Sequence, residues 1–301
     1  MEAFYTALET VLNINPEQAR TLVTNYNTGD LAFFETYFNA LPTVKLEAGN
    51  VKNDTVNETI FIEADHIGEG GYGTVYKNRT RPYVYKEMFD YNRVNNKNSL
   101  LYLKTNFKEA IIQTLLYSDP NYGKHVCRLY KVYRNGNNCV FQMEPLEIDL
   151  EKWLWLNRNE EFRYEIMPAI LLKLIEIFNY FKVRYGFTQG DSNPSNIMTV
   201  KNGDVVESLK IIDFGLSTVR FGDIQIGSQK RSKRTETEVF FILLKYKLDE
   251  KTRKLFSKIV KQPPETPIET LRDILYSKAK TRTRKGGSRS RHVTRKSRRS
   301  V

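Results

Sequence analysis

Five short motifs, in one fixed order, contain the residues of this chain that could do chemistry. A glycine-rich segment comes first, a lysine and a glutamate follow, and two segments with aspartates complete the series. In order they are Gly68-Glu69-Gly70-Gly71-Tyr72-Gly73-Thr74-Val75, Lys86, Glu109, Asp191-Ser192-Asn193-Pro194-Ser195-Asn196 and Asp213-Phe214-Gly215. Glycines let backbone N–H groups approach phosphates, and carboxylate oxygens suit Mg²⁺. Together these parts predict a site for phosphoryl transfer, a reaction that depends on positioning and on charge stabilisation.

The ordered set resembles the eukaryotic-type protein kinase superfamily over residues 61–276. A glycine motif alone would be weak evidence, but dinucleotide-binding folds continue from the glycines into a helix, whereas strand-like segments flank them here. The resemblance implies ATP and Mg²⁺ as cofactors and an α+β, bilobal protein-kinase-like fold. The expected parts are a helical N-terminal extension (1–45), a linker (46–58), a kinase-like domain (59–276) with a β-rich N-lobe (59–143) and a mainly α C-lobe (144–276), and a disordered basic tail (277–301).

The resemblance assigns a role to each polar residue of the motifs. Lys86 would contact the α- and β-phosphates and would be held by an ion pair from Glu109. Asp191 would accept the proton of a substrate hydroxyl, and Asn196 and Asp213 would bind the metal. We therefore expect Lys86, Glu109 and Asp191 to be catalytic residues, with the hydroxyl of a Ser or Thr in a protein substrate as the acceptor.

The resemblance also implies a nucleotide-binding cleft. Met143 corresponds to the gatekeeper residue, and the Glu144 carbonyl and the Leu146 amide would meet the adenine edge. An apolar slot for the adenine would be formed by Val75, Val84 and Met198. The full expected set of nucleotide-binding residues is Ile67, Gly68, Glu69, Gly70, Gly71, Tyr72, Gly73, Thr74, Val75, Val84, Lys86, Glu144, Leu146 and Met198.

Two departures from the family pattern affect the catalytic loop. The usual His-Arg-Asp is Gln189-Gly190-Asp191, so the Arg that holds a phosphorylated activation loop is missing and that switch is not expected. The usual Lys two residues after the catalytic Asp is Asn193, which removes a positive charge near the γ-phosphate at a cost of about 1–3 kcal/mol. Vaccinia-related kinases and the small kinase of the KEOPS complex also have the Gly, and the latter lacks the Lys as well.

The chain is short after Gly215. No Ala-Pro-Glu follows, and residues 235–244 resemble the central helix of the lower lobe, with Glu238 near the place of its usual Asp. About forty residues remain before the tail. We therefore expect most of the peptide-binding helices to be missing, as in the KEOPS kinase and in divergent kinases of large DNA viruses.

Two alternatives to an active protein kinase stay open. A nucleotide-binding pseudokinase, which recruits partners through its N-terminal helices and tail, is favoured by Gln189, Asn193 and the missing Ala-Pro-Glu. A small-molecule kinase similar to the aminoglycoside phosphotransferases would also lack the Lys, but the complete glycine loop counts against it. An active enzyme is favoured by the retention of Lys86, Asp191, Asn196 and Asp213.

Other segments predict the elements that must position these residues. Residues 1–41 predict two or three short helices, one of which begins with Asn15 as cap and Pro16 in the first turn; they loosely resemble ubiquitin-associated modules. Residues 46–57 are polar and aperiodic and are interpreted as a linker. Hairpins are predicted for 126–133 with 138–143 and for 196–200 with 209–212, and helices for 150–156 and 166–185.

Composition places the positive charge in one segment. The formal net charge is +12, and residues 277–301 contain eleven Lys or Arg and no Asp or Glu, which leaves 36 basic against 35 acidic residues elsewhere. This tail would be a solvated end or would contact nucleic acid, an import receptor or an acidic protein.

Cys127 and Cys139 form no zinc motif and fit a reducing compartment. Without a signal-like or membrane-spanning segment, we expect an intracellular protein, in the cytoplasm or nucleus of a host cell or in a virion.

Overall fold

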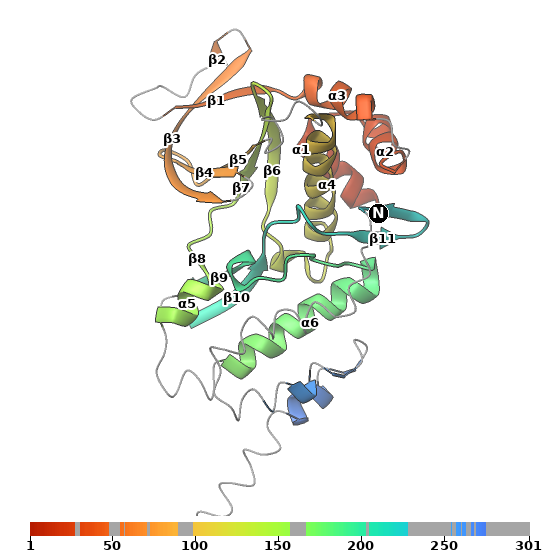
Figure 1. The fold of residues 1–301 in the computed structure, drawn as a ribbon, viewed down its shortest axis with the longest axis vertical. Coiled ribbons are helices and arrows are strands. Elements are labelled where there is room, and N and C mark those ends of the chain that lie inside the picture. Colours follow the sequence, from red (N-terminus) through yellow and green to blue (C-terminus); the bar gives the residue numbers. More distant parts are fainter. Residues whose placement is uncertain are drawn as a thin grey trace, which may run out of the picture.

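The structure is a computed structural model. It describes residues 1–27, 31–47, 55–56, 58–70, 73–89, 99–156, 167–202 and 205–227, and beyond these 254, 257–259, 261–262, 266–267 and 269–274. Within this part, helices and a curved sheet form an upper lobe, and a second group dominated by one long helix forms a lower lobe (Figure 1). The predicted α+β bilobal architecture is therefore confirmed. The predicted helix 235–244 and the basic tail lie outside the described residues.

Three helices begin the chain: α1 (Glu2–Leu12), α2 (Pro16–Thr24) and α3 (Leu31–Ala40). The start of α2 follows from local chemistry, because the Asn15 side chain accepts from the Gln18 backbone N–H at 2.8 Å and the Gln18 side chain accepts from the Asn15 N–H at 3.0 Å. This reciprocal cap satisfies two backbone donors that a helix end otherwise leaves unpaired. Pro16 suits the first turn because it has no N–H to satisfy there. The predicted helix start at Asn15 is confirmed.

A seven-stranded sheet forms most of the upper lobe. Its strand order is β1-β6-β7-β5-β4-β3-β2, and β1 also pairs with β3, so that the six strands β1 and β3 to β7 close into a ring. The expected hairpin around Gly136 is confirmed, and the strand-like segments on both sides of the glycine motif pair with one another. The strands are β1 (Thr43–Glu47), β2 (Thr55–Val56), β3 (Thr59–Gly70), β4 (Gly73–Asn78), β5 (Val84–Met88), β6 (Leu129–Asn135) and β7 (Asn138–Met143).

Two stretches of the predicted linker 46–58 are strands. Leu46 and Glu47 end β1, and Thr55 and Val56 form β2. The linker interpretation is wrong for these residues, because backbone pairing with β3 holds them in the sheet. β1 alternates polar and apolar residues, and Val44 and Leu46 both pack in one small cluster of the upper lobe, but over only five residues this period of two is a weak signal.

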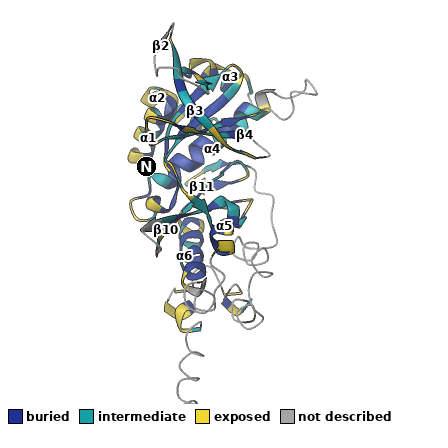
Figure 2. Ribbon diagram, turned by 90° about the vertical axis from the view of Figure 1, so that its left-hand side faces the viewer, coloured by how far each residue is buried: buried dark blue, intermediate teal, exposed yellow. Residues whose placement is uncertain are grey.

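The helix α4 (Ser99–Tyr117) packs against the sheet and carries Glu109. In the described part of the lower lobe, the long helix α6 (Met167–Tyr185) supplies more buried apolar residues than any other element, and Figure 2 shows α4 and α6 largely buried. The remaining elements are η2 (Gly123–His125), β8 (Ile148–Asp149), α5 (Leu150–Leu156), η4 (Pro194–Asn196), β9 (Ile197–Asn202), β10 (Val205–Ile211), β11 (Val219–Phe221) and β12 (Ile224–Ile226). The predicted helix at 150–156 and the predicted hairpin β9–β10 are confirmed.

The β9–β10 hairpin brings two distant motifs together. Ile197 is paired with Ile211, and the Ile212 N–H donates to the Asn196 carbonyl at 3.0 Å. The segment that ends in Asn196 and the segment that begins with Asp213 are therefore neighbours. Among the described residues, no helix has the length and apolar character that crossing a membrane requires.

Candidate active site

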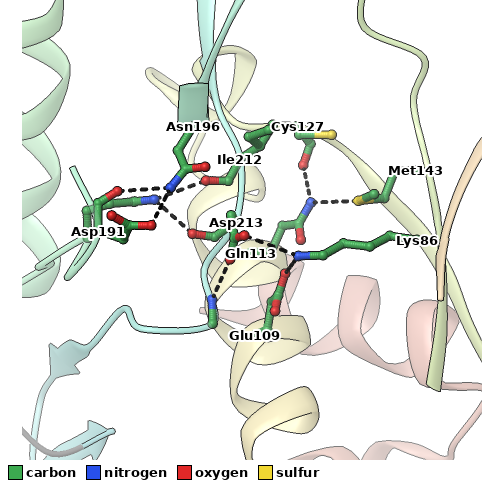
Figure 3. Close-up of polar contacts among 11 residues, drawn as sticks. Lys86, Glu109, Gln113, Cys127, Met143, Asp191, Asn196, Ile212 and Asp213 are labelled. Carbon is green, nitrogen blue, oxygen red and sulfur yellow. Dashed lines mark hydrogen bonds and ion pairs between the residues drawn. The ribbon is translucent and has the colours of Figure 1, made fainter. Parts of the chain in front are cut away.

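A lysine and two carboxylates from three separate elements meet between the lobes (Figure 3). Lys86 on β5 places its Nζ 3.0 Å from Oε1 of Glu109 on α4 and 3.5 Å from Oδ2 of Asp213. Glu109 is only 1% exposed, so its charge depends on this partner. Burial alone would lower the pKa of Lys86, but the two neighbouring carboxylates outweigh it and raise that pKa above its ordinary value. Lys86 is therefore a fixed positive charge at neutral pH.

Asp213 lies in an unusual backbone conformation. Its φ of 59° is in the left-handed region, which side chains other than glycine rarely adopt. The carboxylate faces back toward its own loop, where Oδ1 accepts from the Gly215 N–H at 3.3 Å. A Cβ on Gly215 would lie 3.2 Å from Oε2 of Glu109 and 3.4 Å from Oδ1 of Asp213, so a residue without a side chain fits between the two acids. Phe214, which lies between Asp213 and Gly215 in the sequence, is fully buried and packs on Phe187.

The catalytic loop holds Asp191 and Asn196 against one another. The Asn196 side-chain amide donates to the Asp191 carboxylate and to the Asp191 carbonyl, both at 3.0 Å. These contacts use the nitrogen of the amide and leave its oxygen as a donor for a cation. Asp191 is exposed, as a residue that exchanges a proton with a substrate must be. The side chain of Asn193 accepts from the Ser195 N–H at 3.1 Å, and so it caps the short η4 helix.

Gln189 is a site residue whose role the sequence did not reveal. Its side-chain nitrogen donates to the carbonyl oxygens of Ile212 at 3.0 Å and of Asp213 at 2.8 Å. Its own carbonyl accepts from the Ser217 hydroxyl at 2.8 Å, and the residue is fully buried. Gln189 therefore connects the catalytic loop to the backbone on both sides of the Asp213 motif. The partners are backbone carbonyls, which a sequence pattern does not identify.

Gln113 is a second polar residue that the sequence analysis missed. It lies one turn after Glu109 on α4, is 1% exposed, and donates to the Cys127 carbonyl at 2.8 Å. The same nitrogen is 3.9 Å from the sulfur of Met143, the expected gatekeeper. These contacts connect α4 to the segment before β6 and to the end of β7. The only available signal was a glutamine four residues after Glu109, which a solvated helix face would show equally well.

The glycine motif forms the end of the β3–β4 hairpin, in which Gly68 is paired with Val75 and Gly70 with Gly73. A Cβ on Gly73 would lie 2.3 Å from the Glu87 carbonyl, so strand packing alone requires a glycine there. At Gly68, by contrast, no atom lies within 4 Å of such a Cβ. Close approach of a phosphate group would explain a glycine that the fold itself does not need. Gly71 and Tyr72 of the expected set lie outside the described residues.

The expected adenine contacts come from several elements. Val75 is paired with Lys86 and Val84 with Lys77, so the two valines share a face of the sheet. Val84 is also paired with Met143 of β7. Met198 belongs to the lower sheet, where it is paired with Asp149 and Lys210. The structure therefore brings the two valines together, whereas a shared slot with Met198 stays a prediction.

The segment after Met143 is held through the side chain of Glu144. This carboxylate accepts from Lys210 Nζ at 2.6 and 2.7 Å and from the Arg128 N–H at 2.7 Å. Pro145 follows and has no N–H, which leaves the Glu144 carbonyl and the Leu146 amide as the polar backbone groups predicted to meet adenine. Ile67, the first residue of the expected nucleotide-binding set, is 54% exposed.

The oxygen donors present fit Mg²⁺. Asp213 supplies a carboxylate and Asn196 an amide oxygen, and Mg²⁺ in phosphoryl-transfer sites takes one or two protein oxygens together with substrate phosphates. Within the described residues there is no group of three or more His, Cys, Asp or Glu side chains that could hold an ion by itself. Asp213 and Asn196 would hold such an ion, which would supply positive charge against the charge that develops on the phosphate oxygens.

Comparison with known proteins identifies the class of this site. The model of the protein kinase domain family matches residues 61–238, and the chain therefore belongs to the protein kinase family. MAP kinase kinase mkk-4 of Caenorhabditis elegans is 23% identical over 156 residues, which are 50% of this chain and 40% of that protein. Cyclin-dependent kinase 1 of Encephalitozoon cuniculi is 28% identical over 158 residues, 52% of this chain and 50% of that protein. The chain thus spans at most half of the length of these two relatives.

A solved structure supports the same fold over most of the chain. The crystal structure of the BubR1 kinase domain is similar with a TM-score of 0.52 and 14% sequence identity. The similarity covers 87% of this chain and 93% of that one. At this identity the comparison concerns the arrangement of the elements only. Lys86, Glu109 and Asp213, which meet in this site, all lie within the residues that the family model matches.

Proposed function

We propose that the chain is an active kinase that transfers the γ-phosphoryl group of ATP, with Mg²⁺, to Ser or Thr hydroxyls of proteins. Membership of the protein kinase family supports the reaction class. The observation that carries the proposal is the position of Lys86 Nζ, 3.0 Å from Glu109 and 3.5 Å from Asp213. Within a protein that had lost nucleotide chemistry, a lysine between two largely buried acids would be a costly arrangement to keep.

In this proposal each side chain has one task. Lys86 holds the α- and β-phosphates, Asp213 and Asn196 hold Mg²⁺, and Asp191 orients the acceptor hydroxyl. The hydroxyl oxygen forms a bond to the γ-phosphorus, the bond from that phosphorus to the bridging oxygen breaks, and ADP leaves. The hydroxyl proton passes to the carboxylate of Asp191.

One observation favours a second candidate function, a nucleotide-binding pseudokinase that acts as an interaction scaffold. Asn193 takes the place of a family lysine, and its side chain caps the η4 helix by accepting from the Ser195 N–H. It therefore brings no positive charge to the γ-phosphate. The loss would slow transfer by about tenfold or more, which by itself leaves a measurable enzyme.

Labelled ATP, Mg²⁺ and a basic protein substrate test the proposal directly. We expect transfer of label by the wild-type chain, none by Asp191→Asn, and transfer at the wild-type rate by Asp273→Asn, a matched change of an exposed acid away from the site residues. Hydrolysis of the labelled substrate and identification of the phosphoamino acid would test the preference for Ser or Thr.

The two candidate functions predict different results. Nucleotide binding by thermal shift without any transfer of label, in wild type and Asp191→Asn alike, would support the pseudokinase. Transfer to a small-molecule alcohol but to no protein would support neither candidate. Label on phosphotyrosine alone would contradict the Ser/Thr assignment while leaving the kinase assignment intact.

Two finer assignments are part of the proposal. Gly190 and Asn193 in the catalytic loop support a place among divergent kinases such as those of large DNA viruses, the vaccinia-related kinases and the KEOPS kinase. The concentration of eleven basic residues in 277–301 supports contact of this segment with a polyanion such as nucleic acid, with an acidic protein as the alternative.

A further inference from the structure

The N-terminal helices α1 to α3 contact two parts of the active site. One part is α4, which carries Glu109, and the other is the β11–β12 hairpin, which follows the Asp213 motif. In Figure 1 the three helices lie beside α4, and the N-terminus lies next to β11. The kinase family model begins only at residue 61, so these helices lie outside the region that matches the family.

Aromatic side chains make the contact with α4. The ring of Phe107 lies 6.0 Å from that of Phe34 and 6.3 Å from that of Tyr37, measured between centroids. Lys104 Nζ lies 5.0 Å from the centroid of the Tyr26 ring and 5.7 Å from that of Phe34, while the Lys104 carbonyl accepts from the Tyr26 hydroxyl at 3.4 Å. Phe34 and Phe107 are both at most 2% exposed. The contact is therefore a packed interface with a cation held over two rings.

The geometry of α4 connects this contact to the catalytic ion pair. Residues two apart on an α-helix point about 200° away from one another. Phe107 therefore faces α3 while Glu109 faces the opposite way, toward Lys86, and both side chains are buried. The helix is held between the N-terminal helices on one side and the nucleotide site on the other. A shift of Phe107 away from α3 would move Glu109 relative to Lys86.

The second contact fixes the hairpin after Asp213. The ring of Phe4 on α1 meets that of Phe221 edge-on at 6.0 Å, and the Asn27 side chain donates to the Gln225 carbonyl. The base of the hairpin is bonded to the catalytic loop, because Thr188 and Thr218 exchange two backbone hydrogen bonds of 2.9 Å. The same N-terminal helices therefore hold both sides of the site in which Glu109 and Asp213 approach Lys86.

We infer that α1–α3 form a positioning module within the chain, which holds α4 and the β11–β12 hairpin in the arrangement that catalysis needs. The module would supply in cis the order that a phosphorylated loop held by an arginine supplies elsewhere, which agrees with Gly190 in the arginine position. The module and the kinase core would then behave as one cooperative unit. The catalytic part of this inference rests on the proposed function, whereas the positioning part does not.

Hydrogen–deuterium exchange on the full chain tests the positioning, and turnover tests its effect on catalysis. In Phe34→Ala we expect amide exchange to become at least about tenfold faster both in residues 105–113 of α4 and in residues 219–226 of the hairpin. The turnover number per folded molecule should fall at least about tenfold. Phe34→Leu, which keeps most of the buried volume, should restore both properties to within about threefold of wild type.

A cavity elsewhere in the upper lobe is the matched control. Ile62 is buried in a separate small cluster with Val44, Ala64 and Val140, away from α4. Ile62→Ala should lower the melting temperature comparably, yet leave exchange in 105–113 and 219–226 and the turnover number within about twofold of wild type. If Phe34→Ala fails to fold, the double variant Tyr26→Phe with Asn27→Ala removes only the bonds to Lys104 and Gln225, and about fivefold faster exchange is expected in each element.

Three exchange results would overturn the inference. They are unchanged exchange in both elements, a response of one element without the other, and an equal response to Ile62→Ala. A wild-type chain without turnover would instead contradict the proposed function, and the exchange data would still decide whether the helices position α4 and the hairpin. Faster exchange in both elements with unchanged turnover would show that the module has no catalytic effect, and would also overturn the inference.

Discussion

The side-chain amide of Gln189 donates to the carbonyl of Asp213 at 2.8 Å and so ties the loop that carries Asp191 to the Asp213 motif. Because Asp213 is held at a φ of 59°, its conformation needs such outside support. The family pattern has a histidine at this position, and a histidine ring N–H could also donate a hydrogen bond.

Gln189→Leu should weaken the site by removing this donor while keeping a similar volume. The Ile212 and Asp213 carbonyls would lose a buried partner, which costs about 1–3 kcal/mol in the free energy of unfolding. We expect a lower melting temperature and turnover reduced by about tenfold or more. Gln189→His, which restores a ring N–H, should retain most of the activity. Equal turnover in the leucine variant and in wild type would show that the Gln189 bond does not matter for catalysis.

Putting the family's arginine back at Gly190 should damage the protein. Gly190 has a φ of 79°, and a Cβ there would lie 2.2 Å from the carbonyl oxygen of Leu216, which is backbone and cannot move aside cheaply. We expect Gly190→Ala to destabilise the fold by about 1–3 kcal/mol and Gly190→Arg by at least as much. Thermal melts of the two variants beside wild type are the measurement.

The same position bears on regulation. Without an arginine at 190, turnover of the wild-type chain should be unchanged by phosphatase treatment. Lys230, Arg231, Lys233 and Arg234 follow in the sequence and could attract a phosphate, so the experiment is needed. A large loss of turnover after phosphatase treatment would contradict this expectation.

The steric argument at Gly190 has its own test. A Gly190→Arg variant with wild-type stability would contradict it.

The sequence predicted those parts of the fold and of the site that a local pattern encodes. The capped start of α2 at Asn15 follows from neighbouring residues alone, and the order of the motifs pointed to Lys86, Glu109 and Asp213, which the structure brings together. The parts that were missed depend on contacts between distant segments. Gln189 binds carbonyls 23 and 24 residues away.

In the upper lobe, too, local patterns were predictable from the sequence, whereas contacts between distant segments were not. β1 is a five-residue strand whose alternation of polar and apolar residues is too brief to stand out, and its place in the sheet depends on pairing with β3, which the segment alone does not reveal. The packing of Phe34 on Phe107 joins two helices, α3 and α4, that are far apart in the sequence. An aromatic stripe predicts that a face is buried, but it does not say against what.

Asp213→Ala should abolish catalysis and leave the fold intact. The carboxylate is the predicted main ligand of Mg²⁺, and loss of such a charge in a phosphoryl-transfer site costs at least about two orders of magnitude in turnover. The melting temperature should change little, because the ion pair with Lys86 at 3.5 Å is lost while a like charge beside the buried Glu109 is removed. Turnover assays and thermal melts check the two parts, and full turnover would show that the assignment of Asp213 is wrong.

Stability should fall in mild acid because of His125. This residue is 2% exposed, with Nδ1 2.9 Å from the Leu209 carbonyl and no hydrogen-bond partner for Nε2 among the described residues. Burial lowers the pKa of His125 below its ordinary value near 6.5. Because the unfolded chain then binds the proton more readily, the contribution of His125 is complete above about pH 6.5 and is lost as the pH falls toward the folded-state pKa.

Melting temperatures of wild type and His125→Gln between pH 7.5 and 5 test this prediction. The glutamine keeps a donor for the Leu209 carbonyl but cannot take up a proton. The wild-type stability should fall by at most about 1.4 kcal/mol per pH unit more steeply than that of the variant. Parallel curves would show that His125 does not titrate differently in the two states.

Removal of the basic tail should separate binding of polyanions from catalysis. A chain cut before Lys278 loses all eleven basic residues of the tail, and what is left carries a net charge of about +1. We expect ATP turnover to change less than twofold, because none of the predicted site residues lies in that segment.

Affinity for nucleic acid should fall strongly when the tail is removed. For the full chain, the logarithm of this affinity should fall with the logarithm of the salt concentration, with a slope of about 0.7 to 0.9 per phosphate contact. Titration of both chains with single- and double-stranded nucleic acid at several salt concentrations measures this slope. Equal affinities for the two chains would exclude nucleic acid as the partner of the tail, and an acidic protein or an import receptor would then be the next candidate to test.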